Sequence, residues 1–456
     1  MGVTSKLAKK VPNSLVQLYY RTVPFRYRYE RTYRDTLLKL ETNEERSTAD
    51  LLEDQRRDVI DLISHASLHV PFYKRYFKEH GLNPKDVEGP EFLAKLPIVT
   101  KQMMNENPLD FIDERLDPSK LVEFKTSGST GVKFIFKGTD SMFKKEAAFV
   151  TRAYASHGSR LYEDWSTWIR RYVPQGPDAS LFKKDHELRR VYMSAYHLNN
   201  SSVHEYVRTI NDLRCKTIST YPSTAYVLAC LLEEEGLKLP FIESIHLASE
   251  MLMDEWATRI RKVLPNIKLR AHYGQMEKAS FFHQAASDDY VDNVEYGVTE
   301  FVESDGQLSV IGTGFLNRAM PFIRYDTGDT AELLDDPVQG VGLPVRVKRF
   351  IGRRDDIIVT ADGNRLPGVN FYTMMYKIPG VKMFQIVQEE PDKVRVRIVP
   401  NQEWTSKMAD RTRAALSERL GSTKIYIEEC TEIMRSERTG KIRCIVNQTL
   451  SSTTRS

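Results

Sequence analysis

Strand and helix patterns alternate through the middle of this chain, and that alternation is the strongest constraint on its fold. Residues 217–221 read as a buried strand, after which Pro222 opens a helix. A strand over 241–248, an amphipathic helix over 254–264 and a strand over 267–271 follow. The pattern predicts an α/β fold whose ligands bind beyond the carboxyl ends of parallel strands.

A smaller unit with a different pattern begins near residue 350. It reads as two strands, at 381–387 and 394–399, then a helix over 407–420 and a further strand. We predict a large N-terminal α/β domain followed by a small α+β domain. The predicted segments are 1–45 (basic and aromatic), 46–352 (large domain), 353–450 (small domain) and 451–456 (tail).

Composition excludes several classes of protein. Apolar residues make up 41% and charged residues 28% of the chain, as in globular proteins. No apolar run approaches the ~18–20 residues that span a membrane. The four cysteines are scattered without a C-x-x-C pair, which indicates neither a zinc site nor a disulfide framework and fits a reducing cytoplasm.

Positive charge is concentrated at the N-terminus. The first 40 residues carry +7 of a chain whose net charge is +4, so the body is negative and no nucleic-acid-binding surface is expected. Tyrosines and a phenylalanine lie among these basic residues. Three interpretations stay open for residues 1–40: peripheral contact with the inner, anionic face of a membrane, capping of the core, and packing in a homodimer.

One loop alternates hydroxyl residues with glycines. Glycines let backbone N–H groups approach an anion, and hydroxyls add donors, so a polyphosphate is the expected guest. The loop lacks a Walker A motif, and a surface hairpin turn is the alternative interpretation. Its residues are Thr126, Ser127, Gly128, Ser129, Thr130 and Gly131.

Two further motifs place chemistry-bearing side chains after strands or turns. Tyr273-Gly274 follows a strand, with Glu277 close behind. The tyrosine is suited to stacking on a base, and the carboxylate to holding a hard cation. Asp329 follows a glycine turn, from which its carboxylate is able to accept both hydroxyls of a ribose. For each motif the alternative is an ordinary turn with a surface acid.

Two basic motifs lie farther along the chain. Residues 352–356 read Gly-Arg-Arg-Asp-Asp, and Arg365 follows soon after. Near the C-terminus, Lys441 follows a glycine, so its ammonium can reach a phosphate as a point charge. A solvated linker and a basic tail are the alternatives.

Taken in order, these five motifs resemble those of the adenylate-forming superfamily, which includes acyl-CoA synthetases, peptide-synthetase adenylation domains and luciferases. The resemblance covers about residues 60–445. Finer segments resemble the phenylacetate–CoA ligase family, and within it the branch associated with capsular polysaccharide genes. They are Val70-Pro71-Phe72-Tyr73, Leu96-Pro97-Ile98-Val99-Thr100-Lys101, Tyr221-Pro222-Ser223 and Ala248-Ser249-Glu250.

The resemblance implies a role for each matching residue. The loop 126–131 would wrap the β- and γ-phosphates of ATP. Tyr273 would stack on adenine in a pocket also lined by Gly274, Ser249 and Glu250. Asp329, assisted by Arg353, would bind the ribose, and Glu277 would hold Mg²⁺.

The C-terminal domain would supply the remaining groups. Lys441 would reach the carboxylate and the α-phosphate during adenylation. Asp355 would be the hinge of a mobile domain, and Arg365 would approach phosphate in one of its two orientations. Two departures stand out: Lys133 is displaced from the usual position in the loop, and Lys278 directly follows Glu277 but can point away.

The implied activity is ATP-dependent ligation in two steps. A small-molecule carboxylate becomes an acyl-adenylate, and CoA or another thiol or amine then accepts the acyl group, with surface polysaccharide biosynthesis as the implied setting. The alternatives are an amide-forming ligase acting on an amino sugar or carrier without CoA, and a catalytically silent nucleotide-binding scaffold. Arg170 and Arg171 are candidates for holding a polar or acidic substrate, or else form a solvated strand end.

Overall fold

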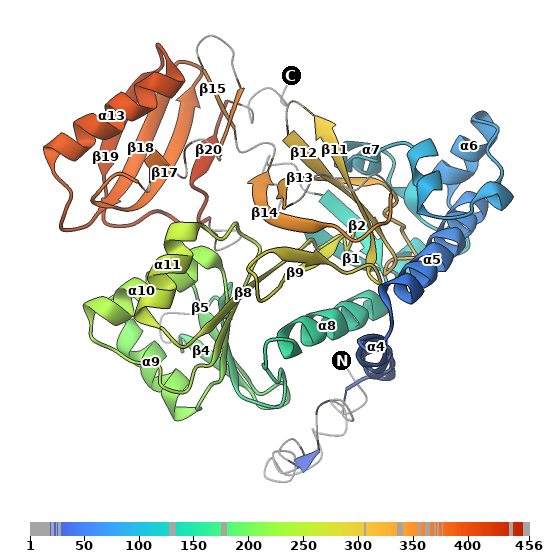
Figure 1. Cartoon of the computed structure of the whole chain (residues 1–456), viewed down its shortest axis with the longest axis horizontal. Helices are drawn as coiled ribbons and strands as arrows, with labels where there is room; N and C mark the ends of the chain where they lie inside the picture. The colour runs from blue at the N-terminus through green and yellow to red at the C-terminus, as the bar shows by residue number, and fades with distance from the viewer. Residues whose placement is uncertain are drawn as a thin grey trace.

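A computed structural model describes most of the chain (Figure 1). The residues described are 19, 22–23, 25, 29–126, 134–174, 180–304, 307–334, 341–353, 357–360, 365–368, 371, 374–375, 377–436 and 441–449.

A twelve-stranded sheet forms the large part of the molecule, in the order β11-β12-β13-β14-β10-β9-β8-β7-β6-β3-β5-β4. Strands β5, β3, β6, β7 and β8 are parallel, whereas β4 and the strands from β9 onward pair antiparallel. The bounds are β3 Ser166–Arg170, β4 Phe182–Asp185, β5 Arg190–Ser194, β6 Thr217–Thr220, β7 Ser244–Ala248, β8 Lys268–Gly274, β9 Phe281–Gln284, β10 Tyr290–Asp292, β11 Gly297–Ser304, β12 Gln307–Gly314, β13 Tyr325–Leu333 and β14 Arg346–Arg353.

The predicted α/β alternation is confirmed. Strands β6, β7 and β8 alternate with the two predicted helices, and only the first three residues of the strand expected at 241–248 lie outside β7. Helix α10 has proline at its first position. Apolar side chains from one sheet face and from helices α9–α11 form one core. These helices are α9 Val203–Asp212, α10 Pro222–Glu234 and α11 Asp254–Val263.

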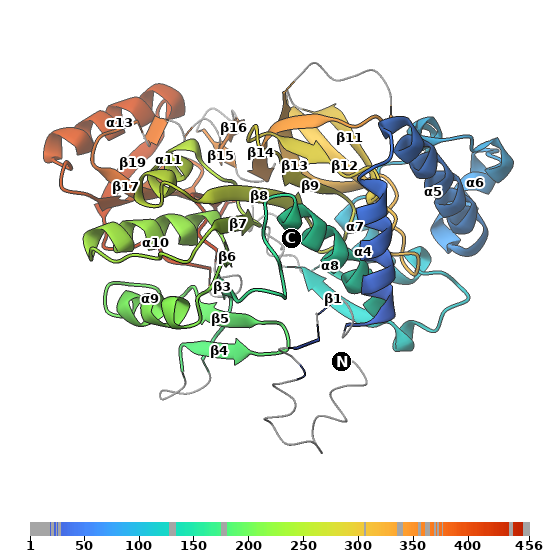
Figure 2. The same ribbon diagram turned by 60° about the horizontal axis from the view of Figure 1, so that its bottom comes forward.

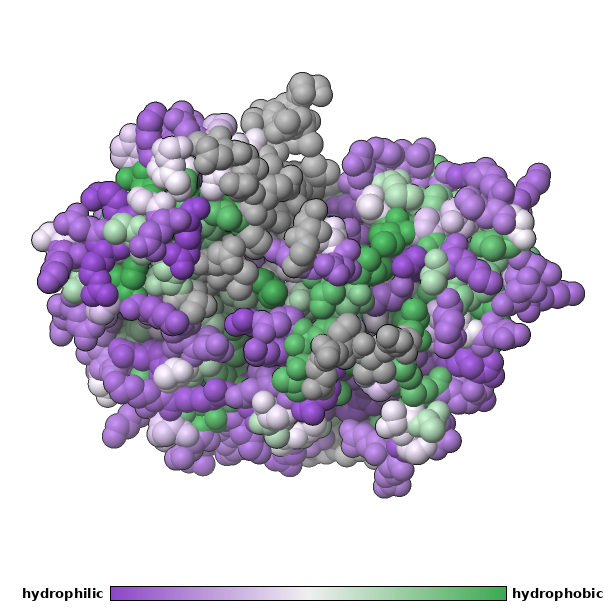
Figure 3. Space-filling model, turned by 45° about the horizontal axis from the view of Figure 1, so that its top comes forward, coloured by the Kyte–Doolittle hydropathy of each residue, from purple (hydrophilic) through white to green (hydrophobic). Residues whose placement is uncertain are grey.

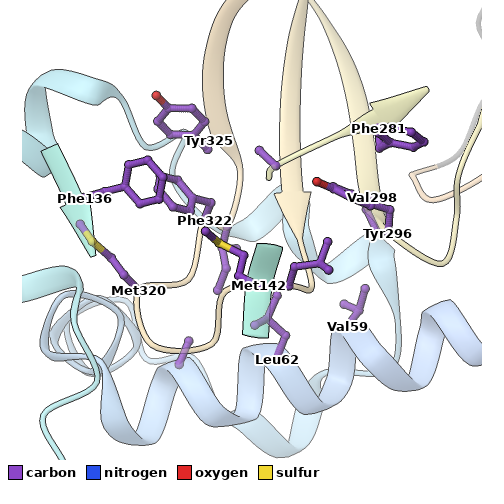
Figure 4. Packing of buried hydrophobic residues seen from close by; sticks show 14 of the residues in the cluster. Val59, Leu62, Phe136, Met142, Phe281, Tyr296, Val298, Met320, Phe322 and Tyr325 are labelled. Carbon is purple, nitrogen blue, oxygen red and sulfur yellow. The ribbon is translucent and has the colours of Figure 1, made fainter. Parts of the chain in front are cut away.

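A second core lies between the N-terminal helices, the hairpin β1–β2 and the strands β11–β13 (Figure 4). Phe322, from the chain between β12 and β13, and Tyr325, which begins β13, enter this core, as do Val59 and Leu62 of α5. The elements are α4 Arg31–Asn43, α5 Thr48–His69, α6 Pro71–Glu79, η1 Pro84–Asp86, η2 Pro90–Lys95, α7 Lys101–Glu106, η3 Pro108–Phe111, η4 Pro118–Lys120, β1 Val122–Thr126, β2 Phe134–Gly138 and α8 Asp140–Ala155.

Aromatic residues of the basic N-terminal segment pack into this core where they are described. Helix α4 lies against α8 (Figure 2), and Tyr33 shares a hydrogen bond of 3.1 Å with Thr151. Phe25 stacks on Tyr162 with ring centroids 4.0 Å apart, and Tyr29 stacks on Phe25. Phe25, Tyr29 and Tyr33 therefore cap this core. Within the described ranges, no helix combines the length and the apolar character needed to cross a membrane.

The small C-terminal domain has its own four-stranded sheet, in the order β19-β18-β17-β20, with helix α13 beside it (Figure 1). The strands and the helix expected from the sequence are present, and Gly421 ends the helix with a φ of +58°. The bounds are β15 Ile357–Val359, β16 Arg365–Pro367, β17 Val381–Glu390, β18 Lys393–Pro400, α13 Ser406–Leu420, β19 Lys424–Glu429 and β20 Ile445–Asn447.

The two domains share a third apolar cluster, to which the large domain contributes Tyr226 and Cys230 of α10, Trp256 of α11, and Met253, which directly precedes α11. Tyr226 of α10 donates a hydrogen bond of 2.8 Å to the carbonyl of Lys382. On the face shown in Figure 3, hydrophilic residues dominate the outer parts, and hydrophobic residues gather toward the middle. The domains are thus joined by a partly apolar junction beside the carboxyl ends of the parallel strands.

Candidate active site

The carboxyl ends of β7 and β8 bring several predicted residues to one edge of the sheet. Ser249 directly follows β7, with a φ of +73°, and Glu250 follows it. Tyr273 and Gly274 end β8. Because neighbouring parallel strands end at the same edge, the adenine-binding residues expected from sequence lie on adjoining strands.

Tyr273 and Asp329 are in direct contact. The Tyr273 hydroxyl donates a hydrogen bond of 2.9 Å to Oδ2 of Asp329. Burial, with a smaller contribution from the Asp329 charge, raises the pKa of Tyr273, so the phenol stays a neutral donor. The Tyr273 ring stacks on Phe350 with centroids 3.7 Å apart and an interplanar angle of 6°. Phe350 therefore covers one face of the ring predicted to stack on adenine.

Asp329 lies on β13, opposite Arg353 on β14 in the antiparallel register. The two residues predicted to hold the ribose are therefore cross-strand neighbours along the backbone. Gly328 has a φ of +74°, and its N–H donates a 2.9 Å hydrogen bond to Asp326. This local turn within the strand fixes the position from which Asp329 projects.

Glu277 is a buried carboxylate, 6% exposed. The Tyr325 hydroxyl donates a hydrogen bond of 3.0 Å to its Oε1. Lys278 has a φ of +60°, and its ammonium pairs with Glu146, 2.5 Å away. Lys278 thus points away from Glu277, as the sequence allowed. Among the described residues, no cluster of three or more His, Cys, Asp or Glu side chains forms a metal site.

A single protein carboxylate is suited to an Mg²⁺ ion that is bound to a nucleotide, and less suited to an Mg²⁺ ion held by protein ligands alone. Mg²⁺ keeps several waters and is usually held by one or two carboxylates together with substrate phosphates. The Tyr325 hydroxyl binds one oxygen of Glu277, and the second oxygen has no hydrogen-bond partner among the described residues. The donor set therefore fits a cation that arrives with its phosphates.

Glu250 joins the two domains. Its Oε2 accepts a 3.0 Å hydrogen bond from the N–H of Ser223 at the N-terminus of α10. Its Oε1 accepts a 3.2 Å hydrogen bond from the N–H of Ile442 in the C-terminal domain. Nearby, Arg435 donates a 3.0 Å hydrogen bond to the hydroxyl of Thr224. One carboxylate therefore satisfies a helix N-terminus and holds the segment that carries Lys441.

The hydrogen bond from Ile442 brings its neighbour Lys441 close to this carboxylate. Burial raises the pKa of Glu250, and the positive charges of Lys441 and Arg435 partly offset that rise. The N–H of Ser436 also donates a 2.9 Å hydrogen bond to the carbonyl of Lys441, which fixes the backbone there. The structure therefore brings together Lys441 and Glu250, two residues separated by most of the C-terminal half of the chain.

The raised pKa of Glu250 gives a pH prediction. The folded state binds this proton more tightly than the unfolded state, so the contribution of Glu250 to the free energy of unfolding is largest in acid and falls as pH rises through the raised pKa. We expect wild type to lose stability relative to Glu250→Gln as pH increases from about 4. Urea unfolding across pH 4–8 measures this difference.

The control for that experiment is Glu403→Gln, which replaces an exposed glutamate of the C-terminal domain. The Glu403 variant should track wild type across the pH range. Identical pH profiles for wild type and Glu250→Gln would contradict the placement of a buried, ionisable carboxylate at the junction.

Some predicted residues lie outside the part of the chain that can be described. They are Ser127, Gly128, Ser129, Thr130, Gly131, Lys133 and Asp355. Thr126 ends β1 and pairs with Phe134 of β2, so the loop joins two antiparallel strands. Arg353 and Arg365 have described backbones, in β14 and β16, without described side chains.

The sequence did not predict three features of the site. They are the stacking of Phe350 on Tyr273, the hydrogen bond from Tyr325 to Glu277, and the contacts of Glu250 with both domains. The signal for Tyr325 was its place at the start of the segment Tyr-Asp-Thr-Gly-Asp, which ends at Asp329. Phe350 carried no signal, because its contact with Tyr273 depends on pairing between distant strands. It also lines a cavity of about 270 Å³ between α11 and β14, which none of the predicted site residues lines.

The chain is similar to several known proteins. Residues 358–448 match the family model of the CapK C-terminal domain. Protein CapK of Staphylococcus aureus is 25% identical over 429 residues, which cover 92% of this chain and 93% of that protein. Phenylacetate-coenzyme A ligase of Thermus thermophilus is 25% identical over 332 residues, covering 68% of this chain and 71% of that ligase.

The fold also matches solved structures. 2-Hydroxyisobutyryl-CoA ligase in the postadenylation state, in complex with R3-HIB-AMP, aligns with a TM-score of 0.66 at 18% identity, covering 96% of this chain and 93% of that one. The fold is therefore that of the adenylate-forming ligases. The chain is similar to CapK along nearly its whole length, and to two phenylacetate-coenzyme A ligases over most of it.

Proposed function

We propose that this chain is an ATP-dependent ligase that activates a carboxylic acid as an acyl-adenylate. The observation that carries the proposal is the junction at the carboxyl ends of β7 and β8. There, Glu250 holds the segment of Lys441 on one strand end, and the adjoining strand presents the Tyr273–Asp329 pair. Similarity to phenylacetate-coenzyme A ligases supports the same reaction class.

In the first step, a carboxylate oxygen attacks the α-phosphorus of ATP. The bond between that phosphorus and the bridging oxygen breaks, and pyrophosphate leaves with the electron pair. Because a carboxylic acid is ionised at neutral pH, no protein base has to remove a proton. Catalysis then consists of positioning and of stabilising charge on phosphate oxygens.

Each site residue has a role in that step. Asp329, with Arg353, binds the ribose hydroxyls, and Tyr273 with Gly274 and the Ser249–Glu250 backbone holds the adenine. The loop Thr126–Gly131 binds the phosphates that leave, and Lys441 stabilises charge where the new bond forms. Glu277 would hold Mg²⁺, which when bound neutralises and orients the triphosphate.

We propose that the second step follows rotation of the C-terminal domain about Asp355, with Arg365 approaching phosphate in one orientation. The TM-score is 0.66 for the postadenylation state of 2-hydroxyisobutyryl-CoA ligase and 0.53 for its thioesterification state, both at 18% identity. The latter match covers 90% of this chain and 92% of that one. This difference supports an adenylation-side arrangement, in which Lys441 lies at the site.

CoA is the acceptor that we favour, because structures of the fold relative contain both 2-HIB-AMP and CoA. An amino sugar or carrier thiol is the second candidate, and a surface-polysaccharide pathway is the proposed setting because of the branch resemblance in the sequence. In that pathway, the location that we propose for the enzyme is the cytoplasm. In every version the first product is an acyl-adenylate.

Carboxylate-dependent exchange of labelled pyrophosphate into ATP tests the proposal. We expect exchange that requires both the acid and Mg²⁺, and that Glu277→Gln lowers steeply. Exchange absent with a broad panel of carboxylates, while ATP still binds, would favour the silent scaffold. Product masses obtained with and without CoA then distinguish the thioester from the amide.

A further inference from the structure

The parallel half of the sheet has two chemically different faces. Residues two apart along a strand share a face, and register extends each face across neighbouring strands. One face is apolar and packs on α9–α11. The other carries polar, aromatic and cationic side chains on its central strands: Arg190, Tyr192 and Ser194; Ser166, Trp168 and Arg170; Thr217 and Ser219; Ser244 and His246.

Helix α8 and the chain that follows it cover this polar face (Figure 2). Tyr154 stacks on His246 with centroids 3.6 Å apart and shares a 3.2 Å hydrogen bond with Ser219. Ser159 hydrogen-bonds both Ser244 and His246, at 2.7 and 2.8 Å. Burying polar side chains costs free energy, and apolar side chains at these positions would avoid that cost. The polar layer therefore indicates a function.

The histidines of this layer are neutral. Burial lowers the pKa of His246 well below its usual range. Burial, and then the charge of Arg170, lower the pKa of His272 to about 3. The positive charge on the polar face therefore comes from arginines.

Arg190 is a buried cation without a carboxylate partner in the described chain. It is 5% exposed, and its guanidinium carbon lies 3.5 Å from the centroid of the Trp168 ring. One nitrogen contacts the Tyr192 hydroxyl at 3.3 Å. Its Nε and Nη2 are buried and have no hydrogen-bond partner among the described residues. Cation–π contact with Trp168 offsets part of the resulting cost.

Arg170 lies at the carboxyl end of β3, nearer the proposed site. Its guanidinium carbon is 5.2 Å from the Trp168 ring and 5.4 Å from the Tyr221 ring, and Nη2 donates a 3.1 Å hydrogen bond to Ser219. Its Nε is buried without a partner in the described chain. This arginine is therefore not the solvated strand end that the sequence left open, whereas Arg171 is exposed.

Both guanidinium groups approach the same Trp168 ring, so they form one cationic patch. Tyr221, which Arg170 contacts, immediately precedes α10, whose N-terminus meets Glu250. Glu250 forms no ion pair with either arginine among the described residues; its oxygens accept N–H bonds from Ser223 and Ile442. Arg190 is buried and Arg170 is half-buried, and neither has an acidic partner in the described chain, so an anion bound beside them would offset the cost of burying these charges.

We propose that Arg170, backed by Arg190, binds a second anionic group on the carboxylate substrate, so that the enzyme activates diacids or phosphorylated acids in preference to simple monoacids. The inference rests on the proposed adenylation. One carboxylate reacts near Lys441, while the second anionic group lies on the polar face. The donors left without partners on Arg170 and Arg190 then gain an acceptor, and the guanidinium fork matches a carboxylate or phosphate.

Matched acids test this preference in the pyrophosphate exchange assay. The pairs are pentanoate with glutarate, and phenylacetate with 4-carboxyphenylacetate. We expect wild type to show a higher kcat/KM for each diacid. Arg170→Met should lower kcat/KM for the diacid by about 10- to 100-fold, the loss expected for a charged hydrogen bond, and leave the monoacid nearly unchanged.

Two variants serve as references. Arg170→Lys keeps the charge and should retain part of the preference. Arg208→Met removes an exposed arginine from α9, which covers the opposite face, and should match wild type. Equal kcat/KM for monoacid and diacid in wild type, or an equal loss for both in Arg170→Met, overturns the inference.

A binding measurement separates this inference from the proposed function. Glutarate should raise the melting temperature of wild type and not that of Arg170→Met, without any turnover. If exchange fails with every acid but this shift is present, adenylation is wrong and the anion site stands. If exchange proceeds with monoacids while glutarate produces no shift, adenylation stands and the anion site is wrong.

Discussion

Replacing Lys441 by alanine is expected to lower carboxylate-dependent pyrophosphate exchange on the order of 10²–10³-fold, as for other preorganised charge stabilisers. An ammonium about 4 Å from a phosphate oxygen contributes roughly 4 kcal/mol at an effective dielectric near 20. Lys441 precedes Ile442, whose N–H binds Glu250 at the edge of the sheet where the predicted nucleotide-binding residues gather. Exchange kinetics measure the loss directly.

ATP binding should survive that substitution, because Tyr273 and Asp329 belong to the large domain and contact each other without Lys441. Titration with a fluorescent ATP analogue tests this point. Lys407→Ala is the matched control, since it removes an exposed lysine from α13 of the same domain. Undiminished exchange in Lys441→Ala would remove Lys441 from the reaction.

Local pattern was sufficient to predict the scaffold. Strands β6–β8 and helices α10 and α11 satisfy sequence rules within a few residues, because burial on both sheet faces and proline at a helix start are local signals. Likewise, Val70-Pro71 separates α5 from α6 at the position where proline fits the first turn of a new helix.

The antiparallel half of the sheet was harder to predict. Strand β10 pairs with β14 over a long separation, Tyr290 opposite Val347, and the pairing of β13 with β14 includes register shifts. The alternation of buried and exposed side chains along one strand does not specify which other strand it pairs with. The contact between Tyr273 and Phe350, which depends on this pairing, was consequently absent from the sequence prediction.

Domain contacts escaped prediction for a similar reason. The motif around Glu250 indicated a nucleotide pocket, but its acceptance of the Ile442 N–H exists only when two separately folded units meet. The same holds for Arg170: sequence placed it at a strand end, and only packing against Trp168 and Tyr221 separates it from exposed Arg171. Sequence therefore identified chemical groups, and tertiary packing decided their surroundings.

The strand that carries Asp329 is supported by a buried ion pair between Arg324 and Glu300. Two hydrogen bonds of 3.0 and 2.8 Å join their forked groups, and the side chains are only 12% and 8% exposed. Arg324 also donates a 2.6 Å hydrogen bond to the carbonyl of Leu96. Its own carbonyl accepts from Val99, so the pair ties the 96–99 segment to the start of β13.

Glu300→Ala is therefore expected to lower the free energy of unfolding by about 3–5 kcal/mol, because it leaves a buried guanidinium without its counter-charge. Asp164→Ala is the matched control: Asp164 binds Arg160 through the same two-point geometry, at 3.1 and 3.0 Å, but that arginine is 66% exposed. The control should lose no more than about 1 kcal/mol. Urea unfolding followed by tryptophan fluorescence compares them, and equal losses would show that burial of the Arg324–Glu300 pair does not determine its contribution.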